Sequence, residues 1–144
     1  MVTKKEFSKI VKKHSGKSPV FKDTIRAFLC GGAICAFGQL LRNCYTSAGM
    51  DTELAGTAVS ISLIFIASLL TALGLFDKIG KFAGAGTLVP ITGFSNAVTS
   101  PAMEFRTEGL VFGTAAKMFD VAGPVIVFGT ASSALAGIIY YFIR

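Results

Sequence analysis

The chain has 144 residues, of which 52% are hydrophobic and only 15% are charged. A soluble domain carries about 25% charged residues, so this chain has too few to cover the surface of one. The composition also excludes disordered chains, collagens and extracellular disulfide scaffolds. It predicts an all-α integral membrane protein with about four membrane segments and no separate soluble catalytic domain.

The excess positive charge lies in the N-terminal tail. The net charge is +6, and residues 1–26 account for all of it, because the rest of the chain is neutral. Phe7, Ile10 and Val11 recur at helical spacing opposite the lysines, which predicts a basic amphipathic helix within residues 1–17. This helix would lie on the membrane surface, a solvated tail being the alternative, and one basic end on a neutral body does not favour nucleic acid. The membrane-facing cations are Lys4, Lys5, Lys9, Lys12 and Lys13.

Residues 18–144 are expected to form one transmembrane helical domain that begins with Ser18 as N-cap. Apolar stretches predict its membrane segments near residues 22–43, 54–76, 82–103 and 121–143. The first is charge-free only over residues 27–41, with Lys22, Arg26 and Arg42 at its ends, and the third is broken. The second is long enough to cross the bilayer as one helix, and the charged turn that follows it is expected to end it at residues 77–81.

Small residues gather on the first and last of these segments. Such residues let helices approach closely in a membrane, so we expect them to form helix-packing faces against neighbouring helices or a partner subunit. They are Gly31, Gly32 and Gly38 in the first segment, and Gly129, Ser133 and Gly137 in the last.

The third segment is uncharged, yet it cannot be one continuous helix. Gly84, Gly86, Pro90 and Gly93 fall within little more than two turns, and a proline inside a helix removes a backbone hydrogen bond that lipid cannot replace. Broken backbone at membrane depth is tolerated only where it is buried in protein or lines an aqueous cavity. The sequence therefore predicts a broken or re-entrant helix that faces the protein interior.

Polar groups of this broken segment, with its freed backbone, are candidates for contact with a solute or ion. The alternative is a tight helix crossing in which the glycines only allow close approach. The candidate pathway residues are Gly84, Gly86, Thr87, Pro90, Thr92, Gly93 and Asn96 in the segment, Gln39 in the first helix, and Glu104 in the charged corner that follows.

The sequence does not favour catalysis. Its one histidine, His14, lies in the basic tail, and no metal-site or nucleotide-loop spacing is present. Ser95 follows Gly93 and Phe94 as in half of a nucleophile elbow, but no intramembrane histidine is available as its base. We expect no catalytic residue, no metal and no cofactor.

The loop charges predict the topology. The basic tail and the turn at residues 77–81 are expected on the cytoplasmic side of the membrane. The corner at residues 104–120 and the loop that holds Arg42, Asp51 and Glu53 are expected on the other side. Both termini are then cytoplasmic, provided that the broken segment crosses the membrane.

Several runs resemble a known family. Residues 27–35, followed by Gly38-Gln39-Leu40, look like the first membrane segment of the stage V sporulation SpoVA membrane proteins (SpoVAC/SpoVAE). Residues 82–94 read Phe-Ala-Gly-Ala-Gly-Thr-Leu-Val-Pro-Ile-Thr-Gly-Phe and are similar to the family signature F-A-G-A-G-x-x-V-P-x-T-G-F. The basic tail and the Glu104-Phe105 corner are more similar to the AC-type branch than to the AE-type branch.

The resemblance implies a protein of the inner membrane of the forespore and spore in endospore-forming bacteria. It implies a mechanosensitive-type channel subunit that passes dipicolinic acid, as its calcium chelate, into the forespore during sporulation and out during germination. An AE-type membrane subunit and an AD soluble subunit are the implied partners. A non-conducting membrane scaffold in the same complex is the alternative function.

Overall fold

The computed structural model describes residues 6–7, 11 and 19–143 of the chain. In this part of the chain the regular elements are all helical, which confirms the all-α class. Three of the described helices are long and apolar enough to cross a membrane. The five lysines of the predicted amphipathic helix and the predicted N-cap Ser18 lie outside the described residues.

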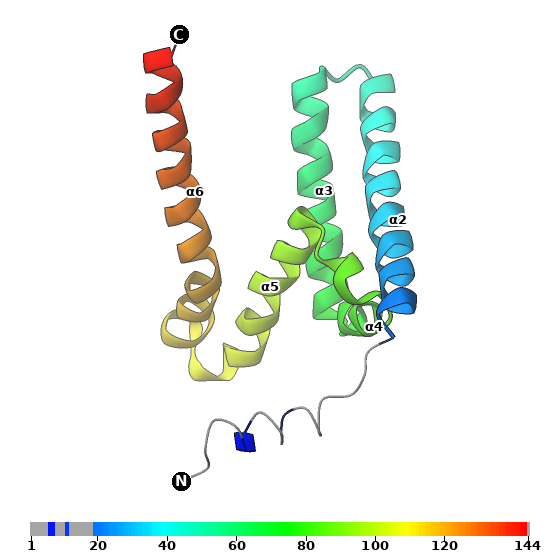
Figure 1. Cartoon of the computed structure of the whole chain (residues 1–144), viewed down its shortest axis with the longest axis vertical. Coiled ribbons are helices and arrows are strands. Elements are labelled where there is room, and N and C mark those ends of the chain that lie inside the picture. The colour runs from blue at the N-terminus through cyan, green and yellow to red at the C-terminus, as the bar shows by residue number, and fades with distance from the viewer. Residues whose placement is uncertain (1–5, 8–10, 12–18, 144) are drawn as a thin grey trace.

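The first two long helices form an antiparallel pair. Helix α2 (Val20–Ser47) and helix α3 (Thr52–Ala72) are joined by a short loop at one end of the molecule (Figure 1). The hydroxyls of Tyr45 and Ser62 lie 2.7 Å apart and link the two helices. Side chains four residues apart on α3 supply most of the buried apolar core: Ala55, Val59, Leu63 and Ala67.

The predicted end of the second segment is wrong. Helix α3 ends at Ala72, because Gly74 takes a left-handed conformation with φ of 67° that glycine alone adopts without strain. The predicted turn at residues 77–81 is instead part of a new helix, α4 (Leu75–Ala83). A salt bridge of 2.7 Å between Asp77 and Lys81, one helical turn apart, supports this helix.

The broken segment is a re-entrant hairpin. Helix α4 lies across the end of the molecule where α3 stops, the 3-10 turn η1 (Gly84–Thr87) leads the chain inward, and helix α5 (Pro90–Glu104) descends to the same end (Figure 1). Thr87 shares a cavity with Leu63, which lies near the middle of α3. The α4–α5 hairpin, residues 75–104, therefore reaches about half the depth of the helix pair.

The chain then turns through the predicted charged corner into the last helix. The corner is the 3-10 turn η2 (Phe105–Glu108), which ends at Gly109 with φ of 99°. A π-helical stretch, η3 (Leu110–Ala115), leads directly into helix α6 (Ala116–Ile143). Residues 116–120, which the sequence analysis assigned to the corner, are thus the first part of one long helix.

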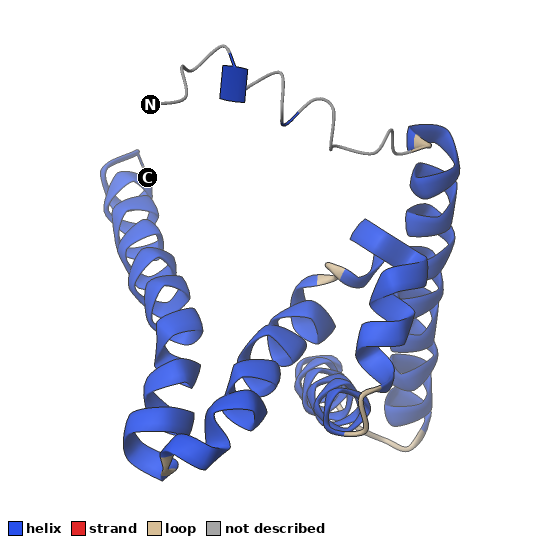
Figure 2. Ribbon diagram, turned by 90° about the horizontal axis from the view of Figure 1, so that it is seen from below, coloured by secondary structure: helices blue, strands red, loops and turns tan. Residues whose placement is uncertain are grey.

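Helix α6 stands apart from the α2–α3 pair. It packs chiefly on α5 and η3, and it contains no buried residue among those described. Figure 2 shows α5 leading away from the other helices to reach it. Nearly the whole of this apolar helix is therefore available to lipid or to another subunit.

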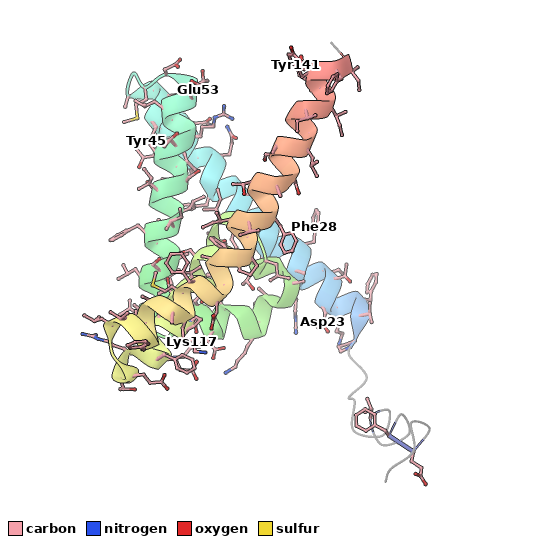
Figure 3. The ribbon with its side chains drawn as sticks, turned by 90° about the vertical axis from the view of Figure 1, so that its left-hand side faces the viewer. Asp23, Phe28, Tyr45, Glu53, Lys117 and Tyr141 are labelled. Atoms are coloured by element: carbon pink, nitrogen blue, oxygen red, sulfur yellow. The ribbon has the colours of Figure 1, made fainter. Side chains whose placement is uncertain are left out.

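The described ends of the chain lie at opposite ends of the molecule. Asp23 and Lys117 mark one end, whereas Tyr45, Glu53 and Tyr141 mark the other (Figure 3). The expectation that both termini share a side required the broken segment to cross, and the hairpin does not cross. The end where α2 begins is named the basic end here, because six of the described cations lie there: Lys22, Arg26, Lys78, Lys81, Arg106 and Lys117.

Cysteine labelling tests the re-entrant topology. In a background where Cys30, Cys35 and Cys44 are replaced by alanine, we expect Lys78→Cys and Glu108→Cys to react with a membrane-impermeant maleimide from the same side of the membrane. The control Thr52→Cys should react only from the opposite side. Reaction of Glu108→Cys on the side of Thr52→Cys would show that the hairpin crosses.

Candidate functional site

The tip of the hairpin, residues 84–89, is irregular for local reasons. Gly84 has φ of 53° and ψ of −125°, a conformation that ends α4. Val89 is extended, as residues before a proline are, and Pro90 then occupies the first turn of α5, where its missing N–H costs no hydrogen bond. Two sequence-predicted pathway residues, Gly84 and Pro90, thus shape the backbone of the tip.

Gly86 is a packing residue. It is buried against α2, and a Cβ built on it would lie 2.5 Å from the carbonyl oxygen of Ala27. One turn further along α2, a Cβ on Gly31 would lie 3.4 Å from the oxygen of Gly86. For this glycine the close-approach alternative holds, because no side chain fits between the tip and α2.

The two predicted threonines turn inward. Thr87 and Thr92 are buried, and their hydroxyls donate to the oxygens of Gly84 at 3.0 Å and Val89 at 3.4 Å within the hairpin itself. They line a largely apolar cavity of about 270 Å³ between the hairpin, α2 and α3. Gly93 completes this tight fold, since a Cβ on it would lie 2.9 Å from the oxygen of Thr87.

A row of hydroxyl and amide groups joins α5 to α3. The Ser95 hydroxyl lies 2.8 Å from that of Ser68 and donates to the oxygen of Ile64 at 3.0 Å. The Thr71 hydroxyl lies 2.8 Å from Oδ1 of Asn96, to which it donates. Asn96 therefore holds α5 against α3. Ser68 and Thr71 were not among the residues predicted from the sequence, although two polar residues three positions apart in an apolar helix can indicate a polar contact with a neighbouring helix.

Two other predicted pathway residues lie away from the hairpin tip. Gln39 is near the end of α2 opposite the basic end, where its amide donates to Asn43 on the same helix at 2.9 Å. Glu104 is exposed at the last residue of α5, at the basic end. The structure thus brings together the candidates from residues 84–96 and leaves Gln39 and Glu104 at opposite ends.

A second cavity lies on the outer side of the hairpin. It measures about 690 Å³ and is lined by residues of α3, α5 and α6, with the hydroxyls of Ser68, Ser95 and Thr99 among them. The Thr99 hydroxyl donates to that of Ser68 at 3.3 Å. The lining is otherwise apolar, so this cavity combines a few polar groups with a hydrophobic wall.

The predicted packing residues divide into two groups. Gly31 meets the hairpin tip, and a Cβ on Gly38 would lie 3.6 Å from Leu63, so both pack inside the chain. For Gly32, Gly129 and Gly137 nothing lies within 4 Å of an added Cβ among the described residues, and Ser133 is exposed. Contact of this second group with a partner subunit stays a prediction.

Acidic, histidine and cysteine side chains do not gather around a metal-sized space. Within the described residues no three of them lie close enough together to hold a metal ion. Between residues 84 and 103 the polar side chains of the hairpin are hydroxyls and one carboxamide.

Substitution of Gly86 tests the contact with α2. Gly86→Ala should destabilise the protein by about 1–3 kcal/mol, the usual cost of overpacking, because the new methyl group meets the backbone of Ala27. Gly32→Ala is the matched control and should leave stability unchanged or slightly raised. Equilibrium unfolding in mixed micelles with an increasing fraction of dodecyl sulfate measures the free energy of unfolding of both variants. Equal stability of the two variants would contradict the contact.

A double-mutant cycle tests the bond between Thr71 and Asn96. The variants Thr71→Ala, Asn96→Ala and their combination should give a coupling energy of about 0.6–1.7 kcal/mol, the range for hydrogen bonds between membrane helices. Pairing Asn96→Ala with Thr130→Ala is the control, because the hydroxyl of Thr130 donates only to its own helix. Coupling as small as in the control would rule out the bond.

The chain is similar to sporulation membrane proteins. Residues 23–139 match the family described as SpoVAC/SpoVAEB sporulation membrane protein. Stage V sporulation protein AC of Bacillus subtilis (strain 168) is 44% identical over 139 residues, which cover 96% of this chain and 93% of that protein. No solved structure gives a significant match. The chain belongs to the SpoVAC/SpoVAEB family of sporulation membrane proteins.

Proposed function

We propose that this protein is a subunit of a membrane channel for dipicolinic acid, carried as its calcium chelate into the forespore and released during germination. Membership of the sporulation family supports this proposal, together with the role that the sequence resemblance implies. The inner membrane of the forespore and spore is the proposed location. The proposed role is transport, and it assigns no catalytic step to the chain.

The hairpin tip is the observation that carries the proposal. Its inner end reaches about half the depth of the helix pair, since Pro90, which follows it, shares a cavity with Ile64 near the middle of α3. Leu88 and Pro90 are exposed there on the described chain, and Gly84 and Ala85 are exposed nearer the basic end. Irregular backbone does not face lipid inside a membrane; it is covered by protein or lines an aqueous cavity. The exposed side of the tip therefore belongs against water, against a partner subunit, or against both.

The channel is proposed to form with other subunits. Helix α6 has no buried residue within this chain, and its glycines at 129 and 137 have open space around them. Small residues on an uncovered membrane helix favour packing against a second membrane protein. The AE-type membrane subunit is the proposed partner in the bilayer, and the AD subunit is the proposed soluble partner.

The basic end is proposed to face the cytoplasm, which is the spore core. Lysine and arginine are enriched on the cytoplasmic side of membrane proteins. Of the described cations only Arg42 lies at the opposite end, and the basic tail of residues 1–17 joins the chain just before α2 at the basic end. The end of α6 would then lie outside the core.

Solute release from liposomes tests the proposed function. Liposomes that contain calcium dipicolinate and the purified protein, with its AE-type partner, should release the solute after an osmotic downshift and retain it before. Retention under both conditions would contradict the channel and leave the scaffold as the remaining role. Liposomes with the protein alone show whether one kind of subunit is sufficient.

Two hairpin variants assign the pathway. Gly84→Leu and Ala85→Leu place a bulky side chain on the exposed face of the tip, and both should reduce release to the level of liposomes without protein. The second variant avoids the positive φ of Gly84, where a leucine adds strain of about 1–2 kcal/mol. Gly56→Leu, on α3 and surrounded by open space, is the control. Normal release by both hairpin variants would remove the tip from the pathway.

A further inference from the structure

A cleft at the basic end borders the hairpin tip and carries charged groups that the proposed pathway does not use. It lies between the start of α2 and the α4–η1 segment and has a volume of about 300 Å³. Its lining includes the charged side chains of Asp23, Arg26 and Lys81, the ring of Phe82, and the backbone of Gly84. It therefore brings ionic groups of two elements to the level at which α2 enters the apolar part of the molecule.

The guanidinium of Arg26 has no carboxylate partner among residues 19–143. The guanidinium lies over the ring of Phe82 in a cation–π contact, with its Cζ 5.3 Å from the ring centroid. This contact occupies the face of the guanidinium and leaves its N–H edges for an acceptor lying in its plane. The flat, forked edge of arginine suits the oxygens of a phosphate or carboxylate.

The other two charges complete the electrostatics of the cleft. Lys81 pairs with Asp77 at 2.7 Å, and this hydrogen bond and attraction raise the pKa of the lysine. Asp23 has no cation within 4.0 Å in the described part of the chain, although Arg26 follows it by one helical turn. Among residues 19–143 the cleft thus offers a cation without a carboxylate partner for an anionic group, and a carboxylate without a cation partner for a hydrogen-bond donor.

An exposed aromatic ring borders the ionic groups of the cleft. Phe82, which lines the cleft, is 62% exposed. A free phosphate ion has no apolar part that could contact this ring, whereas a phospholipid has acyl chains attached to its phosphate through glycerol. The neighbourhood of the cleft therefore favours a lipid as the source of the phosphate.

We propose that this cleft binds the phosphodiester headgroup of a membrane phospholipid. Arg26 binds the phosphate oxygens with Lys81 nearby, and an acyl chain lies along Phe82. Asp23 favours a headgroup that carries a donor, such as the hydroxyls of phosphatidylglycerol or the ammonium of phosphatidylethanolamine. It disfavours the phosphomonoester of phosphatidic acid, whose extra negative charge it repels.

Native mass spectrometry of the full-length protein in detergent tests the site with dioleoyl phosphatidylglycerol as probe. Arg26→Gln should weaken lipid binding about tenfold, the loss of one charge-assisted hydrogen-bonding group. Arg106→Gln, which removes an exposed arginine at the same end, is the matched control and should bind as the parent does. Equal binding by Arg26→Gln and the parent, or an equal loss in the control, would overturn the site.

Two further arms define the ligand. Asp23→Asn should raise the binding of phosphatidic acid relative to phosphatidylglycerol, and an unchanged ratio would contradict the role of Asp23. Millimolar inorganic phosphate should fail to displace the lipid, and complete displacement would overturn the lipid assignment in favour of a free anion. No solute gradient is involved, so these results are independent of whether the protein conducts.

Discussion

Backbone groups inside hydrocarbon must find partners within the protein, and the architecture of this chain follows from that constraint. The long helices satisfy most of their backbone internally, with the exception of the position of Pro124 in α6. Many of their hydroxyls donate to a carbonyl one turn earlier, as Thr24, Ser60 and Thr130 do. The segment with three glycines and a proline cannot do this in one helix. It folds instead as a hairpin that enters from the basic end and returns there, so that the break falls at a single tip.

The tip is held in place from two sides by different kinds of contact. On one side the backbones of Gly86 and Ala27 meet without any side chain between them, which requires glycine. On the other side α5 is joined to α3 by hydroxyls and one carboxamide, in particular through Ser68, Ser95 and Asn96. Hydrogen bonds between membrane helices have direction as well as strength, so they define how α5 lies on α3. Close packing fixes the position of the tip, and the polar row fixes the course of the returning helix.

The sequence predicted those features that depend on local chemistry. Uncharged length predicts α2 and α3, and the cluster from Gly84 to Pro90 predicts the break, because both follow from a single stretch of chain. The end of α3 was missed because Gly74 interrupts the helix through its φ angle and not through hydropathy. The positions of Gln39 and Glu104 at opposite ends of the molecule follow from the topology, which no local pattern contains, and their place in a pathway stays a prediction. Whether the hairpin crosses or returns depends on contacts such as that of Gly86 with Ala27, which no local pattern contains.

The cleft at the basic end and the hairpin tip are adjacent and share residues. Arg26 immediately precedes Ala27, the residue that meets Gly86, and Phe82 and Gly84 lie on the segment that leads to the tip. A phospholipid in the cleft would therefore contact both α2 and the base of the hairpin. The proposed lipid would thus lie directly beside the contact that positions the tip. In a protein whose proposed channel opens with membrane tension, this adjacency provides a direct physical connection from the lipid to the pathway, without a separate sensor domain.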